Sequence, residues 1–349
     1  MKVLAPAGSF DSAMVAIEAG ADAIYLGLND VKHQRSRCSN FSRKELQKIV
    51  NLSNEKDVEI NVTFNSSYNE DNFNSIREKL DFLENIRVDA IIISDIGLID
   101  IIRKNHERLK IAFSVQGQCS NSDFGNFLRE HGVHKLILDR NISIQEAKSI
   151  KDNTGLEVEM FAFGFQCYSQ DSICYMGDYF AGEPCNVQCS QKVKFLDTGA
   201  KARFFFMKFQ SALNHIPEMI EAGIDYIKIE GRQRSSGYVY DTTSIFKEAI
   251  HEYNSDPGGY RVKREWIRRL RKQAYHFEIT ESFYKPYRYR RDIIDDPSML
   301  NAYAYFKDIF SNFLETKNSG KIVKELKNAV KIQFFEPKKI KKHNFSELR

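Results

Sequence analysis

The sequence is poor in cysteine and lacks any long run of apolar residues. Only six of its 349 residues are cysteine, and its first residues do not contain the apolar stretch of a secretory signal. No segment has the roughly 20 consecutive apolar residues that a membrane-spanning helix requires. We therefore expect a cytoplasmic protein without a membrane span, whose thiols stay reduced, so a framework of disulfides is disfavoured.

Sequence motifs of the common hydrolases are also missing. The eight histidines show no HExxH or other paired spacing, so nothing supports a zinc protease. Neither a GxSxG nucleophile elbow nor a Cys–His pair suited to nucleophilic catalysis is visible. These absences weaken a protease interpretation, which would need a triad assembled from distant segments.

Four of the six cysteines lie within one short stretch of the chain. Cys167, Cys174, Cys185 and Cys189 are separated by six, ten and three residues. In a reducing compartment, such clustering favours thiolates that converge on one metal centre over disulfides. Unliganded thiols are the remaining alternative.

The spacing of these cysteines favours an iron–sulfur cluster over zinc. Structural zinc sites usually pair cysteines two to four residues apart, and only Cys185 and Cys189 are that close. Wider spacing within a long loop suits a cluster, whose ligands come from a segment wrapped around it. Nearby aromatic residues would form an apolar shell around a cluster or simply pack in the core: Phe161, Phe163, Phe165, Tyr168, Tyr175, Tyr179 and Phe180.

Residues 1–253 alternate short apolar strands with amphipathic helices, the pattern of a parallel sheet with crossover helices. Ser42 with Glu45 and Ser143 with Glu146 predict capping boxes at two helix starts. Eight strand–helix pairs predict a TIM-type (β/α)8 barrel, and an open doubly wound sheet is the alternative. The expected strands are Val3–Ala5, Ala23–Leu26, Glu59–Phe64, Ala90–Ser94, Lys110–Val115, Lys135–Leu138, Glu157–Ala162 and Tyr226–Ile229.

The loops at the C-terminal ends of barrel strands carry the chemistry in such folds. The cysteine-rich loop, residues 163–192, follows the seventh expected strand and would lie at this mouth. Asp95 and Gln116 follow strands four and five, as candidate catalytic residues that hydrogen-bond substrate or as loop caps. Glu230 and Arg232 follow the eighth strand, and would either orient a carboxylate or phosphate or form a structural pair that closes the barrel.

The C-terminal quarter of the chain is basic. Residues 261–349 contain 22 Lys and Arg against 11 Asp and Glu, whereas residues 1–260 contain 29 against 36. After a turn-rich boundary at 254–260, we expect a small α+β region with a helix near Ser298–Lys317 and a strand at Ala329–Phe335. Cations interleaved with tyrosines would bind RNA, or the region would pair with the acidic barrel or a partner protein. The candidate RNA-binding residues are Arg264, Arg268, Arg271, Lys285, Tyr287, Arg288 and Arg290.

Five blocks within residues 1–253 resemble the peptidase U32 family: LAPAGSFDSAMVAIEAGADAIYLG, NFSRKEL, IIISDIG, EMFAFGFQC with a second cysteine after six residues, and IKIEGR. The resemblance implies a barrel-like catalytic domain and a [4Fe–4S] cluster bound by four cysteines. It implies oxygen-independent hydroxylation of an RNA base in tRNA or rRNA, with prephenate as oxygen donor, or of a small aromatic ubiquinone precursor. Other members are named collagenase-like proteases.

The resemblance leaves two ligand sets for the cluster. Our first choice is Cys167, Cys174, Cys185 and Cys189, and the second replaces Cys167 by Cys38, which lies in the loop after the second strand. Cys119 is expected to be a buried thiol. An iron–sulfur hydroxylase with an electron-transfer partner is the expected function, and a peptidase or a non-catalytic iron–sulfur subunit, paired with another U32 protein, is the alternative.

Overall fold

The computed structural model describes residues 1–31, 38–165, 167, 208–274, 279–281 and 284, and the backbone of 192–195, 201–203 and 332–334. The chain divides into two compact units. The first contains Met1–Asn186 and Met207–Arg290, and the second contains Val187–Phe206 and Arg291–Arg349. The barrel and the candidate site described below belong to the first unit.

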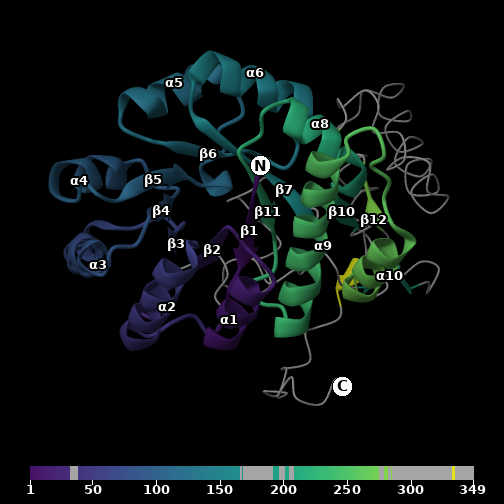
Figure 1. The fold of residues 1–349 in the computed structure, drawn as a ribbon. Helices are drawn as coiled ribbons and strands as arrows, with labels where there is room; N and C mark the ends of the chain where they lie inside the picture. Colours follow the sequence, from purple (N-terminus) through teal and green to yellow (C-terminus); the bar gives the residue numbers. More distant parts are fainter. Residues whose placement is uncertain are drawn as a thin grey trace, which may run out of the picture. The chain divides into compact units, whose positions relative to one another are not determined.

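A closed ring of eight parallel strands forms the centre of the first unit (Figure 1). Each strand pairs with the next, and the last pairs with both β7 and β1, which closes the sheet. The predicted (β/α)8 barrel is therefore confirmed, and the open-sheet alternative is wrong. The strands are β1 (Lys2–Pro6), β2 (Ala23–Leu26), β3 (Glu59–Phe64), β4 (Ala90–Ile93), β5 (Lys110–Phe113), β6 (Lys135–Ile137), β7 (Glu157–Phe165) and β11 (Tyr226–Ile229).

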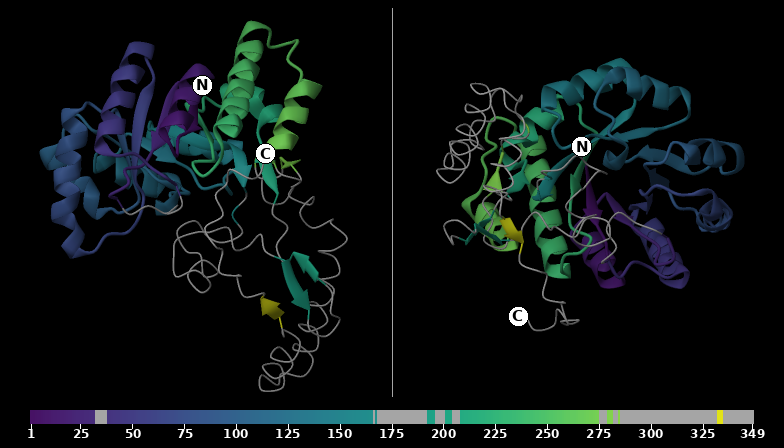
Figure 2. Two further views of the ribbon diagram at one scale, coloured as in Figure 1. Left: turned by 90° about the horizontal axis from the view of Figure 1, so that it is seen from below. Right: turned by 180° about the vertical axis from the view of Figure 1, so that it is seen from behind.

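Helices surround the ring on its outer side (Figure 1; Figure 2, right). Both predicted capping boxes are present: Ser42 and Ser143 each accept from the backbone three residues on, and Glu45 and Glu146 accept in return. The α-helices are α1 (Phe10–Glu18), α2 (Arg43–Lys56), α3 (Phe73–Asn85), α4 (Gly97–Asn105), α5 (Ser122–Glu130), α6 (Ile144–Thr154), α8 (Ile216–Glu221), α9 (Ser236–Ser255) and α10 (Arg264–Gln273). Short 3-10 helices are η1 (Glu70–Asn72), η2 (Val115–Gly117) and η4 (Leu213–His215).

Strand β7 is longer than predicted and continues beyond the ring. Its end pairs antiparallel with β10 (Phe209–Ser211), which pairs with β12 (Ile279–Thr280). Gly164, with φ of 149°, lets this end pass close to β11, because a Cβ there would lie 2.5 Å from Cβ of Glu230. The cysteine-rich insertion therefore leaves β7 at the barrel mouth, as predicted.

Alternate residues of the strands point to opposite faces of the sheet. One set packs against the helices, and the other fills the barrel interior with a small apolar cluster that includes Leu4, Ile92 and Phe161. The interior also takes up charged and polar side chains, described below. Burial of the apolar set contributes roughly 1.5–3 kcal/mol for each large side chain, which is what allows the barrel to carry buried charge.

The second unit contains a three-stranded antiparallel sheet with the order β13-β8-β9. Its strands are β8 (Lys192–Phe195), β9 (Lys201–Arg203) and β13 (Ile332–Phe334). The predicted strand at Ala329–Phe335 is thus confirmed in a shorter form. The predicted helix at Ser298–Lys317 lies outside the described residues.

Candidate active site at the barrel mouth

Glu230 is held at the mouth by Arg140, which lies in the loop after β6. Its carboxylate accepts from Nη1 of Arg140 at 3.0 Å, and the same nitrogen donates to the Phe165 carbonyl at 2.9 Å. The Arg140 guanidinium lies 3.9 Å from the ring centroid of Phe161, and both charged side chains are largely buried. The pair therefore joins the loop after the eighth strand to the loop after β6, and it is Glu230–Arg140 and not Glu230–Arg232.

Arg232 reaches across the mouth to the loop after β2 and to β3. Its Nη1 donates to Oγ1 of Thr63 at 3.0 Å and to Oδ1 of Asn40 at 3.5 Å. The backbone at Arg232 lies against Gly8, where a Cβ would come within 1.7 Å of the Arg232 carbonyl oxygen. Only glycine allows this approach of the loop after β1, so the mouth depends on it.

Asp95 and Gln116 lie where predicted, just after β4 and β5. Asp95 accepts from the backbone of Gly97 at 2.9 Å and of Tyr68 at 3.2 Å, so it joins the loops after β3 and β4. Gln116 lies in η2, and its backbone N–H donates to Oγ of Ser114 at 3.2 Å. These contacts of Asp95 are those of a loop cap, which was the alternative to a catalytic role.

Two of the candidate ligand cysteines are among the described residues, and both lie at this end of the barrel. Cys167 follows the end of β7, Cys38 lies in the loop after β2, and both are half-buried. Because both thiols lie at the mouth, either of these two loops could supply a ligand to a cluster bound there. Cys174, Cys185 and Cys189 lie outside the described residues, within which no group of three or more His, Cys, Asp or Glu is placed to hold a metal.

Cys119 differs from these cysteines in its surroundings. Its side chain is fully buried and its Sγ donates to the Asn121 carbonyl at 3.8 Å. Burial raises the pKa of this thiol to about 11, so it stays protonated at neutral pH and is a poor metal ligand. The prediction of a buried thiol is confirmed.

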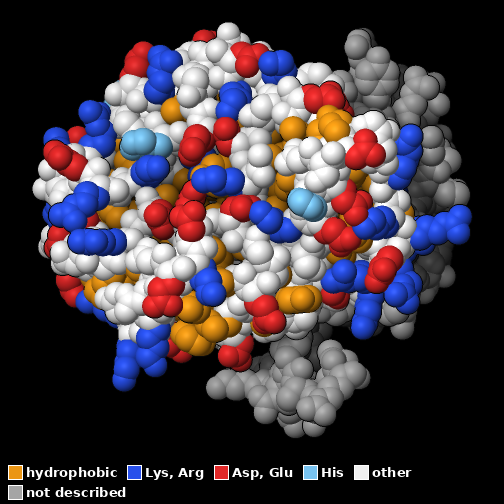
Figure 3. All heavy atoms as spheres, viewed as in Figure 1, with side chains coloured by type: hydrophobic (Ala, Val, Ile, Leu, Met, Phe, Trp, Pro, Cys, Tyr) orange, Lys and Arg blue, Asp and Glu red, His pale blue; other side chains and the backbone are white. Residues whose placement is uncertain are grey.

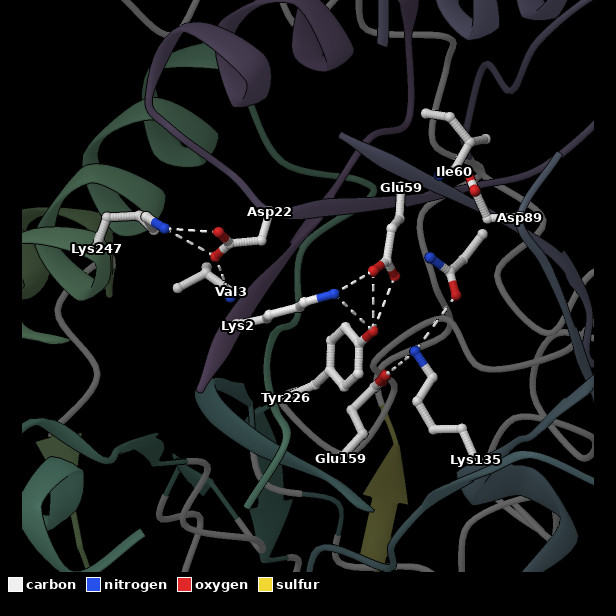
Figure 4. Close-up of polar contacts among 11 residues, drawn as sticks. Lys2, Val3, Asp22, Glu59, Ile60, Asp89, Lys135, Glu159, Tyr226 and Lys247 are labelled. Carbon is white, nitrogen blue, oxygen red and sulfur yellow. Dashed lines mark hydrogen bonds and ion pairs between the residues drawn. The ribbon is translucent and has the colours of Figure 1, made fainter. Parts of the chain in front are cut away.

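Three charged residues from adjacent strands meet inside the barrel, and sequence analysis did not identify them. The carboxylate of Glu159 on β7 lies 3.0 Å from Nζ of Lys135 on β6 and 2.8 Å from Nζ of Lys228 on β11. Their exposed fractions are 0%, 4% and 6%. Figure 4 shows Lys135 reaching Glu159 from the neighbouring strand. We call these three residues the interior triad.

Burial and mutual attraction act against each other in the interior triad. Burial opposes ionisation of Glu159, but the two ammonium groups outweigh it and hold the pKa of this carboxyl below its usual value. For Lys228, burial dominates and lowers the pKa although Glu159 raises it. Aromatic faces line the lysines: the Tyr226 ring centroid lies 3.9 Å from Nζ of Lys135, and that of Tyr25 lies 4.1 Å from Nζ of Lys228.

A second polar cluster closes the N-terminal end of the barrel. Nζ of Lys2 lies 2.5 Å from Glu59, whose other oxygen accepts from the Tyr226 hydroxyl at 2.9 Å (Figure 4). The interior clusters had a signal in the sequence. Lys228 is the single charge in β11, and Glu159 follows Glu157 in a strand that is otherwise apolar. The period-two pattern places Glu159 and Lys228 on the inner face.

Helix α10 presents a row of cations on its outer face. Arg264, Arg268 and Arg271 are exposed and are spaced four and three residues apart, which puts them on one side of the helix. Figure 3 shows Lys and Arg side chains over α10. We call these three arginines the α10 cation row. The other predicted RNA-binding residues, Lys285, Tyr287, Arg288 and Arg290, lie outside the described residues.

The opposite face of α10 is tied to α9. Trp266 is buried, and its Nε1 donates to Glu248 at 2.9 Å. Arg269 pairs with Asp241 at 2.7 Å, so it is already neutralised within the barrel unit. The helix therefore separates its basic residues into a paired inner set and an outer row.

Taken together, a closed parallel barrel with charged and thiol side chains at the C-terminal ends of its strands defines an enzyme of the (β/α)8 class. The chain belongs to peptidase family U32, whose family model matches residues 8–293. The family resemblance seen in the sequence is thereby confirmed.

Relatives with assigned names fall into two groups. The chain is 28% identical over 298 residues to "tRNA hydroxylation protein P1" of Bacillus subtilis, covering 81% of this chain and 70% of that protein. It is 28% identical to the "Collagenase" of Porphyromonas gingivalis over 275 residues, covering 72% and 66%. It is 25% identical to the "23S rRNA 5-hydroxycytidine C2501 synthase" of Escherichia coli over 260 residues, covering 72% and 39%.

No helix among the described residues has the length and apolar character needed to span a bilayer. This agrees with the absence of a membrane-length apolar run from the sequence.

Proposed function

We propose that this protein is an iron–sulfur enzyme that hydroxylates an RNA base without using O2. The observation that carries the proposal is its similarity to a tRNA hydroxylation protein over 81% of the chain. The similarity to an rRNA hydroxycytidine synthase supports the same substrate class. The barrel mouth and the α10 cation row supply places for a base and for a phosphate backbone.

Cys167, Cys174, Cys185 and Cys189 would hold a [4Fe–4S] cluster at the mouth, with Cys38 as the alternative to Cys167. When bound, such a cluster accepts or relays the electrons that hydroxylation without O2 requires, which also implies an electron-transfer partner. Prephenate is the proposed oxygen donor. Arg232, anchored by Thr63, provides a guanidinium of the kind that binds carboxylates.

The α10 cation row would contact the phosphate backbone of the RNA. Arg264 and Arg271 are seven residues apart, about 10 Å along the helix at a rise of 1.5 Å per residue. Such a row tracks phosphates without reading sequence, so it would add affinity and leave the choice of base to the mouth. Lys285, Tyr287, Arg288 and Arg290 are proposed to bind RNA as well.

Nucleoside analysis of cellular RNA tests the proposed reaction. We expect a strain that lacks the protein to lose one hydroxylated nucleoside from its tRNA or rRNA, as measured by mass spectrometry. Wild-type protein and Cys119→Ser should restore the nucleoside, and Cys174→Ser, which removes a ligand that both proposed sets share, should not. An unchanged nucleoside profile in the deletion strain would remove the proposal.

Anaerobic purification tests the cluster and its ligands separately. Iron and sulfide analysis should find about four of each per chain for the wild type and for Cys119→Ser. If Cys167 is a ligand, Cys167→Ser lowers the iron content and Cys38→Ser does not, and the reverse identifies Cys38. A chain that holds no iron after reconstitution contradicts the proposal.

A peptidase is the second candidate, because the Porphyromonas gingivalis relative is named a collagenase. It predicts cleavage of gelatin by the purified protein that survives Cys167→Ser. A third form of the proposal is an iron–sulfur subunit that works only with a second U32 chain. Restoration of the nucleoside by the protein alone in vitro would rule out that subunit role.

A further inference from the structure

With both lysines protonated, the interior triad has a net charge of plus one, because it contains two ammonium groups and one carboxylate. Glu159 is a single carboxylate between two lysines, all three at most 6% exposed, and the proposed chemistry at the mouth does not use them. A buried charge without a counter-charge is costly, and in practice such a group neutralises by releasing its proton. One of the two amines is therefore expected to be neutral in the folded protein.

Lys228 is the lysine whose surroundings favour the neutral, deprotonated amine. The Tyr25 and Phe161 rings lie 4.1 and 5.9 Å from its Nζ and keep water from it. The positive charges of Lys135 and Arg232 add to the effect of burial, and together they lower the pKa of Lys228. A desolvated lysine next to other cations is the usual source of a nucleophilic amine.

Asn61 gives an independent sign that something else binds in the barrel. Its side chain is 1% exposed and its Oδ1 accepts from Nζ of Lys135 at 3.4 Å. Its Nδ2 has no hydrogen-bond partner among the residues that the structure describes. An unpaired buried donor costs about 1–3 kcal/mol. An oxygen atom of a bound molecule would satisfy it, close to the ammonium of Lys135.

We propose that Lys228 is a nucleophilic amine that forms a Schiff base with a small carbonyl compound bound in the barrel interior. The amine nitrogen bonds to the carbonyl carbon, the carbon–oxygen bond breaks, and the oxygen leaves as water. One proton of the water comes from the amine and the other from Lys135. Glu159, 2.8 Å from Lys228, accepts the second proton of the amine and passes it to Lys135, 3.0 Å away, which restores both groups. No oxidant or reductant is needed, and the inference does not depend on RNA hydroxylation.

The position of Lys228 in the strand places this chemistry below the mouth. It lies two residues before Glu230, on the inner face of β11, beside the rings of Tyr25 and Phe161. A small compound with a carbonyl and a second oxygen matches the polar groups at this position. The second oxygen would accept from Nδ2 of Asn61.

Reductive trapping in the full-length protein tests the proposal. The protein is incubated with pyruvate and then treated with borohydride, which converts a Schiff base into a stable secondary amine. Pyruvate serves as probe because its ketone reacts slowly with solvent-exposed lysines. Lactate, which has a hydroxyl in place of the ketone, is the matched control. We expect one adduct per chain, mapped to Lys228 by peptide mass spectrometry.

Several matched variants identify the modified residue, so the assignment does not depend on a single substitution. Lys228→Arg, which keeps a long nitrogen-bearing side chain and cannot form the imine, should abolish the adduct, and Lys247→Arg on the outer surface should not. Asn61→Leu should lower the yield at limiting pyruvate about tenfold, the effect of one lost hydrogen bond to the ligand. Peptide mapping of the wild-type protein identifies the modified lysine without any variant, so the assignment holds even if Lys228→Arg misfolds.

Three results would overturn the proposal. They are an adduct level equal to the lactate control, an adduct spread over exposed lysines, and an adduct on Lys135 instead of Lys228. None of these results bears on the nucleoside experiment, so the failure of one proposal is distinguishable from the failure of the other.

Discussion

The barrel interior and the outer face of α10 use the same kinds of side chain in opposite ways. Inside, Lys135 and Lys228 share one buried carboxylate. Outside, Arg264, Arg268 and Arg271 stand in solvent. Water screens the outer charges and leaves them free to bind a partner, whereas burial couples the inner charges to folding and alters their acidity. Cationic side chains therefore serve structure and chemistry in the barrel interior, and they are available for binding on the outer face of α10.

The largest expected effect comes from removing the shared carboxylate. Glu159→Ala leaves two buried lysines without a counter-charge and should lower the free energy of unfolding by about 3–5 kcal/mol. Urea denaturation measures this change. The matched control is Glu248→Ala, which also removes a partner of a lysine and of an N–H but at a half-exposed site. For Glu248→Ala we expect a loss of at most about 1 kcal/mol in the free energy of unfolding. Equal losses for the two variants would contradict the difference between buried and exposed charges.

Removal of the inner anchor of α10 should have the next largest effect. Trp266 packs on α9, and Trp266→Ala is expected to cost about 3 kcal/mol or more in unfolding free energy, because a large buried side chain leaves a cavity. Thermal or urea unfolding gives the value. A loss below about 1 kcal/mol would show that α10 is not integral to the barrel unit.

The pH dependence of stability tests the acidity of the inner amine. Because burial lowers the pKa of Lys228, the unfolded state binds more protons between that pKa and the ordinary value of about 10.4. The free energy of unfolding should therefore rise with pH across this interval, by up to about 1.4 kcal/mol per unit of pKa difference. Lys228→Met should lose this rise. Parallel pH profiles for wild type and variant would disprove the depressed pKa.

The smallest effect on stability is expected for the outer row. Replacing Arg264, Arg268 and Arg271 together by Gln should change the unfolding free energy by less than about 0.5 kcal/mol. RNA binding should weaken, and the slope of log affinity against log salt should fall by about 2, since each single-strand phosphate contact contributes about 0.7. Arg269→Gln, which breaks the pair with Asp241, is the control and should leave the slope unchanged.

Much of the fold could be predicted because its signals are local. Three strands, Ala23–Leu26, Glu59–Phe64 and Tyr226–Ile229, have the predicted bounds, and the two capping boxes form as expected. The predicted end of the seventh strand was three residues short, because the pairing of Phe163–Phe165 with β10 depends on a distant segment. Local periodicity carries no information about such a partner.

The candidate site was predictable in part for the same reason. Strand order placed Asp95, Gln116, Glu230 and Arg232 at one end of the barrel, which the structure bears out. The partners were not predictable: Glu230 meets Arg140, and Arg232 meets Thr63. Side chains brought together from strands far apart in sequence are chosen by barrel geometry, which a linear pattern does not contain.

The sequence by itself determined the closed barrel, the position of the cysteine segment after β7 and the basic character of α10, because periodicity, caps and composition act over short distances. Only the tertiary structure decided that Lys135, Glu159 and Lys228 meet in the interior and that the arginines of α10 divide into a paired and an outer set. The physical reason is that burial and charge pairing depend on which strands and helices become neighbours after the ring closes.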